Sequence, residues 1–473
     1  MDHSHEPLHP SAARSSKPRR SPPLAYLIGG SLVLLAVLRL TVSSQPVFTL
    51  SYGSAMDTAG PSTVTYTRGV IPAGTRPRTL RIGSFNVRRD YETAHPYLAP
   101  FALPAMGLSD ALRSSEAKRW GERSWADRRE RYVDMVLWGE VDVIGFQEAL
   151  ENQIQDLHKL LGEDEWGYVG VGRDDGKKAG ESVPIFYQRD RLTLLDSAHF
   201  WLSPTPSVPG SKGWDAGLTR MVTFTWFADR HSAPSSPSSH SAKGGEKDAA
   251  DFVVINTHWD DRGLQARAKS AKLILKLVEE HVLGPARAAQ GGREPLVVLM
   301  GDLNSVAEEE GYQVLTGGRY PAEGKKGEGK KGEEDEERRA FRDARHEVAT
   351  RRTGLAGPGA MSGRFGPLNT YTGFTPSDLA KVIDFIMPFS SAAFLPSSPS
   401  SSSSSSSFSA RGQTKWKVAK YGVVPNFFED IAGARPQPGR RGADDWSGED
   451  AMLVSDHRLV VVGMEEVVVR EER

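Results

Sequence analysis

Six short apolar runs, spread over most of the chain, each end in polar residues of types that bind ions or transfer protons. These polar residues are Asn86, Glu148, His258, Asp302 with Asn304, Asp384, and Asp456 with His457. Each run has the length of a buried strand, and each polar group follows where such a strand would reach the surface. A chain has little reason to place so many carboxylates, amides and imidazoles at strand ends unless they converge. The pattern therefore predicts a sheet protein whose strand ends meet at one site.

The residue types in this set indicate a particular chemistry. Carboxylate and amide oxygens are the ligands that a hard divalent cation such as magnesium prefers. Two histidines can carry positive charge against developing negative charge on a phosphoryl group. The set therefore fits the hydrolysis of a phosphate ester.

Each motif also has an ordinary structural interpretation when it is taken alone. The run GDLNS, with Asp302 and Asn304, has the composition of a strand-to-loop turn. The run SDH, with His457, also suits the start of a helix or turn, and His258 suits a buried, hydrogen-bonded histidine. Glu148 suits a strand-end salt bridge. Because these alternatives are independent of one another, the complete set favours one common site.

Composition excludes several other functional classes. The 473 residues include no cysteine, which removes disulfides, thiolate zinc sites and cysteine nucleophiles. The formal charge is −1, so no protein-wide positive field attracts polyanions, as it would in a protein that coats nucleic acid.

The N-terminal region predicts contact with a membrane. Residues 24–42 are mostly apolar and follow a basic flank, so we expect a single-pass transmembrane signal anchor there. Residues 1–23 would then be a disordered cytoplasmic tail, and residues 43–77 a flexible stalk. The catalytic part would lie on the lumenal or extracellular side. The alternative is a cleaved signal peptide, which would make the protein secreted.

One domain is expected over residues 78–465. Three polar, low-complexity stretches interrupt it, at 231–249, 322–338 and 396–410. They cannot bury enough apolar surface to offset their ordering entropy, so we interpret them as disordered inserts in surface loops.

Many strands and few strong helices are expected in this domain. The predicted strands are Leu80–Val87, Val141–Phe146, Ile185–Tyr187, Phe200–Leu202, Val222–Trp226, Phe252–Thr257, Pro295–Met300, Val382–Pro388 and Leu459–Val462. One helix would be capped by Ser124, and another would carry Ala271, Ile274 and Val278 on one face. This content predicts an α+β protein with two packed sheets and helices on the outside.

The order of the motifs resembles that of the endonuclease/exonuclease/phosphatase superfamily, with its deoxyribonuclease-I-like fold. The resemblance covers residues 79–462. It is closest to a branch with GRDDG, GE-x-x-PIFY, FWLS and GWDA motifs, which begin here at Gly172, Gly180, Phe200 and Gly213. It implies a four-layer α/β/β/α sandwich of two mixed β-sheets flanked by helices.

The resemblance also implies a metal site. Glu148 would be the principal ligand of Mg²⁺, or of Mn²⁺ in its place. Asn86 and Asp456 would complete the site directly or through water.

Catalytic roles follow from the same resemblance. Asp302 would position the attacking water, and Asn304 would meet charge on the phosphoryl oxygens together with the two histidines. Asp384 would lie behind His457 and Glu181 behind His258, an arrangement that would keep both histidines charged.

Three further positions concern the substrate. Arg220 is a candidate phosphate contact, while Tyr187 would either orient the cleft or pack against it. After the histidine, many relatives carry Phe-Asp-His where this chain has Trp259-Asp260-Asp261. Substrate contacts there are expected to differ, although these acidic residues also suit the start of a helix.

The expected function is that of a magnesium-dependent phosphoesterase, either a phosphodiesterase or nuclease, or a phosphatase. Its substrate would be nucleic acid, a lipid head group or a small organic phosphate, and no protein partner is predicted. The alternative is a catalytically inactive, membrane-tethered binding protein on the same scaffold.

Overall fold

The structure, a computed structural model, describes the folded part of the chain in segments. The described residues are 78–90, 122–231, 250–284, 294–318, 339–348, 363–374, 378–397, 413–428 and 452–469. The predicted tail, membrane segment and stalk lie outside them, as do the three predicted inserts except for a few residues at their edges. Among the described residues, no helix combines the length and apolar character that a membrane span needs.

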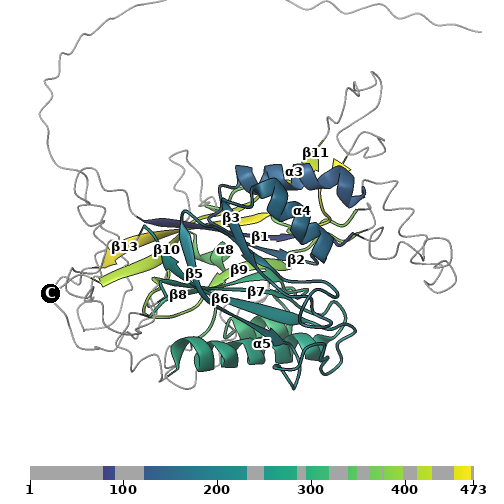
Figure 1. Ribbon diagram of the computed structural model, residues 1–473. Helices are drawn as coiled ribbons and strands as arrows, with labels where there is room; N and C mark the ends of the chain where they lie inside the picture. Colours follow the sequence, from purple (N-terminus) through teal and green to yellow (C-terminus); the bar gives the residue numbers. More distant parts are fainter. Residues whose placement is uncertain are drawn as a thin grey trace, which may run out of the picture. The chain divides into compact units, whose positions relative to one another are not determined.

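Two mixed β-sheets form the centre of the fold (Figure 1). The six-stranded sheet has the order β10-β13-β1-β2-β4-β3, and the five-stranded sheet the order β5-β6-β7-β8-β9. The strands of the first sheet are β1 (Thr79–Asn86), β2 (Val143–Gln147), β3 (Trp166–Val169), β4 (Ile185–Gln188), β10 (Gln413–Val423) and β13 (Val460–Val469). Those of the second are β5 (Leu192–Trp201), β6 (Met221–Asp229), β7 (Phe252–His258), β8 (Leu296–Asp302) and β9 (Asp384–Pro388). Two short strands, β11 (Phe427–Phe428) and β12 (Met452–Leu453), form a separate two-stranded sheet.

Helices cover the outer faces of both sheets. The first sheet carries α3 (Trp125–Trp138) and α4 (Glu151–Leu161), and the second carries α5 (Leu264–Val278), as Figure 1 shows. The shorter elements are a π-helical turn, η1 (Glu279–Leu283), and the helices α7 (Glu310–Leu315) and α8 (Ala344–Glu347). The predicted four-layer α/β/β/α sandwich is therefore confirmed.

The central strands β7 and β8 are largely apolar because they are buried on both faces. In β7, Phe252 and Val254 pack into the core between the two sheets. Val253 and Ile255, on the opposite face, pack with the residues of α5. Every residue of β7 is buried, which explains why the run showed no polar alternation.

Helix α3 begins where the sequence predicts. The Ser124 hydroxyl accepts a hydrogen bond from the backbone N–H of Asp127 at 3.3 Å, and thereby caps the helix. Tyr132, Val133 and Val136 are buried on its inner face. In α5, Ala271, Ile274 and Val278 share the buried face, as their spacing predicts.

A buried polar bridge ties the two sheets together beneath the strand ends. Asn256 on β7 donates to the carbonyl oxygens of Phe146 and Pro184, at 2.8 and 2.9 Å, and accepts from Gln147 at 2.8 Å. The sheets approach closely here because Gly145 has no side chain. A Cβ at Gly145 would lie 2.6 Å from the Asn256 side chain. The bridge fixes the position of the two sheets relative to each other beneath the site.

Candidate active site

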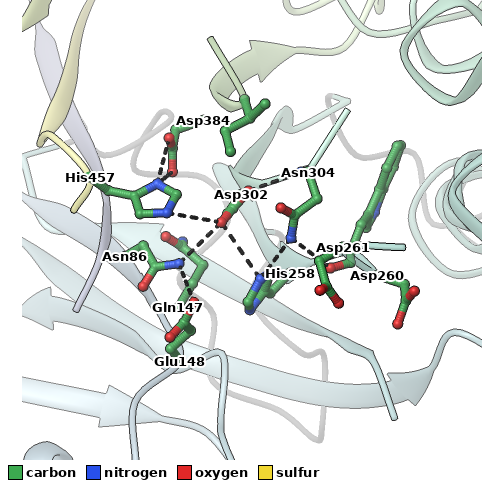
Figure 2. A network of polar contacts seen from close by, with 12 residues as sticks. Asn86, Gln147, Glu148, His258, Asp260, Asp261, Asp302, Asn304, Asp384 and His457 are labelled. Carbon is green, nitrogen blue, oxygen red and sulfur yellow. Dashed lines mark hydrogen bonds and ion pairs between the residues drawn. The ribbon is translucent and has the colours of Figure 1, made fainter. Parts of the chain in front are cut away.

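The strand ends bring the polar residues of both sheets to one place (Figure 2). Asn86 ends β1 and Glu148 directly follows β2; these two strands run parallel, so their carboxyl ends are neighbours. In the second sheet, β7 and β8 are also parallel, and His258 pairs with Asp302 in the register. The convergence expected from the sequence is present.

The carboxylate of Asp302 is the centre of the group, as Figure 2 shows. Its Oδ2 atom accepts a hydrogen bond from Asn86 Nδ2 at 3.1 Å. The Nε2 atoms of His258 and His457 each lie 3.6 Å from the same oxygen. Burial and the charge of Asp384 raise the pKa of Asp302 to about 7, where a carboxylate can exchange a proton near neutral pH.

Asp384 lies behind His457, as the resemblance implies. Its two carboxylate oxygens lie 3.0 and 2.9 Å from His457 Nδ1. The backbone N–H of Asp384 donates to the Thr370 hydroxyl at 3.0 Å, which holds the start of β9 in place. Burial lowers the pKa of His457, but Asp384 and Asp302 outweigh this effect and raise it to about 10. His457 is therefore an imidazolium that joins two carboxylates.

The expectation that Glu181 is the partner of His258 is wrong. Arg220, rather than Glu181, meets the Nδ1 atom of His258, with its NH1 atom at 3.0 Å. An arginine can only donate, so Nδ1 must be the acceptor and the proton is on Nε2. Burial and the charge of Arg220 place the pKa of His258 well below its ordinary value. His258 is thus a neutral donor, and the expectation that it stays charged is wrong as well.

Glu181 lies one step further from the reaction centre. It accepts from Arg173 and, at 3.0 Å, from Arg89, while Arg220 NH1 lies 3.9 Å away. Its position between guanidinium groups makes it a carboxylate that holds arginines together. Arg220 correspondingly supports His258 through its contact with Nδ1.

Asn304, in the loop after β8, contacts His258 at the end of the neighbouring strand β7. Its Nδ2 atom donates to the Trp259 carbonyl oxygen at 3.0 Å and lies 3.0 Å from His258 Nε2. Its backbone N–H donates to Asp302 at 2.9 Å. Gly301 makes this turn possible, because a Cβ there would lie 2.1 Å from the Thr257 carbonyl oxygen.

Glu148 has an unusual backbone conformation. Its φ angle is +60°, a left-handed value that costs a residue with a side chain about 1–2 kcal/mol. The side chain accepts from Asn86 Nδ2 at 3.0 Å and from the backbone N–H of Arg89 at 3.2 Å. Burial opposes its ionisation, but the nearby charges of Arg88 and His457 and the hydrogen bond from Asn86 hold the pKa of Glu148 below its ordinary range. A strained, ionised carboxylate at a strand end is typical of a functional position.

Asp456 joins this group through Arg88. Its Oδ2 atom lies 3.6 Å from Arg88 NH1, and its Oδ1 atom lies 3.3 Å from the Ser455 hydroxyl. The Ser455 hydroxyl also lies 2.7 Å from the Asn86 carbonyl oxygen, to which it donates. Asn86, Glu148 and Asp456 thus belong to one connected network.

Two sets of residues are candidates to hold a metal ion. Atoms of Asp302, Asp384 and His457 lie within 4.8 Å of one another, the only such geometric group within the described part of the chain. However, His457 Nδ1 in this group is already hydrogen-bonded to the Asp384 carboxylate, so these two side chains occupy each other. Glu148 is ionised, and two of its four lone-pair positions are taken by the N–H donors. Glu148 therefore keeps lone pairs that could bind a hard cation.

Two other expectations are resolved by packing. Tyr187 is buried, with its ring 5.0 Å from that of Phe227 in the core between the sheets, so it packs rather than lining a cleft. Asp260 accepts from the backbone N–H of Gly263 at 2.7 Å, immediately before α5. The helix-start interpretation of the acidic stretch therefore holds for Asp260. Asp261 instead pairs with Arg220, at 3.2 Å.

Several residues of the network had no assigned role in the sequence. Ser455 and Arg88 lie within motifs that were recognised for their neighbours, and Arg173 lies in the GRDDG run. Thr370 belongs to no recognised motif. For the serine and the two arginines, a position inside a motif was the only available signal, because these residue types are too common to indicate a site alone; Thr370 gave no signal.

Comparison with known proteins identifies the family. Residues 83–457 match the model of the Endonuclease/Exonuclease/phosphatase family. The chain belongs to this family. No match was found among curated proteins.

Solved structures with the same fold are similar along most of the chain. A family protein from Bacteroides thetaiotaomicron is 22% identical, covers 82% of this chain and 98% of its own, and has a TM-score of 0.51. A second, from Bacteroides vulgatus, is 24% identical over 82% and 99% of the two chains, with a TM-score of 0.50. The mannosyl-6-phosphatase Bt3783 of Bacteroides thetaiotaomicron is 23% identical over 82% and 99%, with a TM-score of 0.50. At this identity the likeness shows the shared fold.

Proposed function

We propose that the protein is a metal-dependent phosphoesterase that hydrolyses its substrate by in-line attack of water. Membership of the family supports a hydrolase of phosphate esters. The observation that carries the proposal is the convergence on one oxygen of Asp302. Asn86 comes from the first sheet, His258 from the second, and His457 from the loop before β13. A carboxylate held among proton donors suits the activation of water beside a phosphoryl group.

The chain's own residues divide the reaction between them. Asp302 would accept a proton from the attacking water. His258 Nε2 and Asn304 Nδ2 are both donors only 3.0 Å apart, so an anionic oxygen bound between them would accept from both. The imidazolium of His457 would stabilise negative charge on the opposite side of Asp302.

Magnesium is the proposed cofactor, with manganese as a substitute. Glu148 would hold it, together with the side-chain oxygens of Asn86 and Asp456. The ion would supply electrostatic stabilisation of charge on the phosphoryl oxygens.

Substitution of Glu148 by glutamine tests this assignment. Glu148→Gln keeps the size and shape of the side chain but removes its charge. We expect the affinity for Mg²⁺, measured by isothermal titration calorimetry without substrate, to fall about 10- to 100-fold. Glu151→Gln, in the first turn of α4, is the matched control and should bind as the native protein does. Equal Mg²⁺ affinity in Glu148→Gln and the native protein would reject the site.

A panel of phosphate esters tests the function itself. Purified full-length protein is assayed with phosphodiesters, nucleic acid, lipid head-group esters and sugar phosphates, with Mg²⁺, with Mn²⁺ and with a chelator. Mannose 6-phosphate is included because one of the similar structures is a mannosyl-6-phosphatase. We expect the protein to hydrolyse at least one class of ester, and we expect this hydrolysis to stop when the metal is chelated. No hydrolysis with either metal would instead favour the inactive binding protein.

The membrane anchor remains a proposal for residues 24–42. If this segment spans a bilayer, full-length protein expressed in cells stays in the membrane pellet after extraction at alkaline pH. A variant without residues 24–42 should move to the soluble fraction. Release of the full-length chain by the same extraction would contradict the anchor, and a shortened secreted form would indicate a signal peptide.

A further inference from the structure

Tyr371 lies beside the reaction centre, next to His457. It pairs with His457 on one side and with Lys381 on the other, in two antiparallel β-bridges. Residues that face each other across an antiparallel bridge project their side chains to the same side. The ring of His457 reaches to 3.6 Å from Asp302, so Tyr371 projects its side chain to the side of the bridge that faces the site.

The side-chain contacts agree with this arrangement. The ring centroids of Tyr371 and His457 are 5.0 Å apart, edge to face, and Lys381 Nζ lies 5.2 Å from the centroid of the Tyr371 ring. His457 is buried, Tyr371 is half-buried and Lys381 is exposed, so the three side chains form a row from the reaction centre to the surface. Tyr371 therefore lies where the site meets solvent and where a substrate can reach it.

The backbone of Tyr371 is fixed by the segments on either side of it. Its N–H donates to the carbonyl oxygen of Lys381 at 3.0 Å, and its own carbonyl oxygen accepts from the N–H of Lys381 at 3.1 Å. The N–H of the next residue, Thr372, donates to the carbonyl oxygen of Asp456 at 2.8 Å. The ring is thus held against His457 before any substrate binds, which lowers the entropy cost of a contact with it.

The hydroxyl of Tyr371 is a hydrogen-bond donor that the protein itself does not use. It makes no hydrogen bond to another described residue, although a tyrosine in such a position usually directs its hydroxyl to a polar partner. Burial and the negative charges of Asp456, Asp378 and Asp302 raise the pKa of this hydroxyl above its ordinary value. It therefore keeps its proton at neutral pH and stays able to donate.

We propose that Tyr371 is a substrate-contact residue whose hydroxyl donates a hydrogen bond to an oxygen of the phosphate ester. The inference rests on the proposed phosphoesterase function and adds a donor to it. His258 and Asn304 are the donors on one side of Asp302, whereas Tyr371 belongs to the side of His457. Donors on both sides would hold the ester in one orientation relative to the attacking water. The acceptor is either a phosphoryl oxygen or the oxygen of the leaving group.

Substitution of Tyr371 by phenylalanine tests the contact. Tyr371→Phe removes the hydroxyl and keeps the ring against His457, so thermal unfolding of the full-length protein should be unchanged. We expect kcat/KM on the best ester of the panel to fall about 10- to 100-fold, the loss of one hydrogen bond to a charged group. Tyr168→Phe is the matched control, because the Tyr168 hydroxyl accepts from Gln155 at the surface, at 3.2 Å, and its loss should leave kcat/KM unchanged. Phenylalanine fully replaces a ring that only packs, so a native kcat/KM in Tyr371→Phe would overturn the proposal.

Esters that differ only in their leaving group show which oxygen accepts the hydrogen bond. The pair is 4-nitrophenyl phosphate and phenyl phosphate for a phosphatase, or the methyl diesters of both for a phosphodiesterase. An equal loss for the two esters in Tyr371→Phe assigns the bond to a phosphoryl oxygen. A larger loss for the phenyl ester, which has the poorer leaving group, assigns it to the leaving oxygen. A loss confined to the nitrophenyl ester fits neither acceptor and would count against the donor.

Failure of this inference is distinguishable from failure of the proposed function. If the native protein hydrolyses no ester of the panel, the phosphoesterase function and the role of Tyr371 fall together. If the native protein is active and Tyr371→Phe is equally active, only the role of Tyr371 is rejected.

Discussion

Asp302→Asn is expected to lower kcat about 10²- to 10⁴-fold, the range of a general base. The amide keeps the shape of the carboxylate but cannot accept the proton of the attacking water. It also presents an N–H group where Asn86 and the two histidines now direct donors toward one oxygen. Both effects act on the reaction centre, so the loss should appear in kcat. Initial rates on the best ester of the panel, at saturating Mg²⁺, measure it.

A surface aspartate provides the control for this substitution. Asp134 on α3 is 56% exposed and pairs with Arg131, in the neighbouring turn of its helix. Asp134→Asn should leave kcat unchanged. Thermal unfolding of both variants shows whether the fold is intact. If correctly folded Asp302→Asn keeps more than a tenth of the native kcat, Asp302 does not activate the water.

The layers of the fold were predictable because burial on both faces leaves a continuous apolar run. The strands with Phe252–Thr257 and Pro295–Met300 illustrate this, since each lies between the opposite sheet and helix α5. Polar residues interrupt such runs only where the strand ends. Parallel pairing then brings neighbouring ends together, as for His258 and Asp302. The central residues of the site could therefore be identified from local patterns.

Among the elements that were missed, β10 and α4 show two different reasons. In β10, the buried Trp416 and Val418 alternate with Lys415 and Lys417, a strand pattern that was present in the sequence. The alternation breaks at a register shift between Val418 and Lys420, so the strand was not recognised. Helix α4 begins at Glu151, three residues after Glu148, so its polar first turn looked like a continuation of the motif.

Contacts between side chains far apart in the chain were not predictable. The partner of His258 is an arginine 38 positions away, on the loop that leads into β6. The sequence contains both Arg220 and Glu181 near motifs, and a carboxylate is the usual partner of a histidine. Only the packing of Arg89 and Arg173 around Glu181 shows that this carboxylate is already occupied. The protonation state of His258 thus depends on residues that do not contact it directly.

The pairing of Asp384 with His457 predicts a second large effect on catalysis. Asp384→Asn replaces the acceptor of the Nδ1–H bond with an amide that can present an N–H group instead. The imidazolium would lose its counter-charge and its fixed orientation toward Asp302. We expect kcat to fall about 10²- to 10³-fold, comparable to the loss of one stabilising donor. Asp343→Asn is the matched control, because Asp343 is equally buried but bonds to Tyr312 outside the site.

A double-mutant cycle separates this role from a purely structural one. His457→Ala should also reduce kcat strongly, and the double variant with Asp384→Asn should be no worse than the more severe single variant. This outcome is expected because the carboxylate would act only through the imidazole that it holds 2.9 Å away. If the two losses multiply instead, Asp384 contributes independently, as a metal ligand would. Mg²⁺ affinity of Asp384→Asn then decides the question: an unchanged affinity leaves Glu148 as the principal ligand, whereas a large loss transfers that role to the group of Asp302, Asp384 and His457.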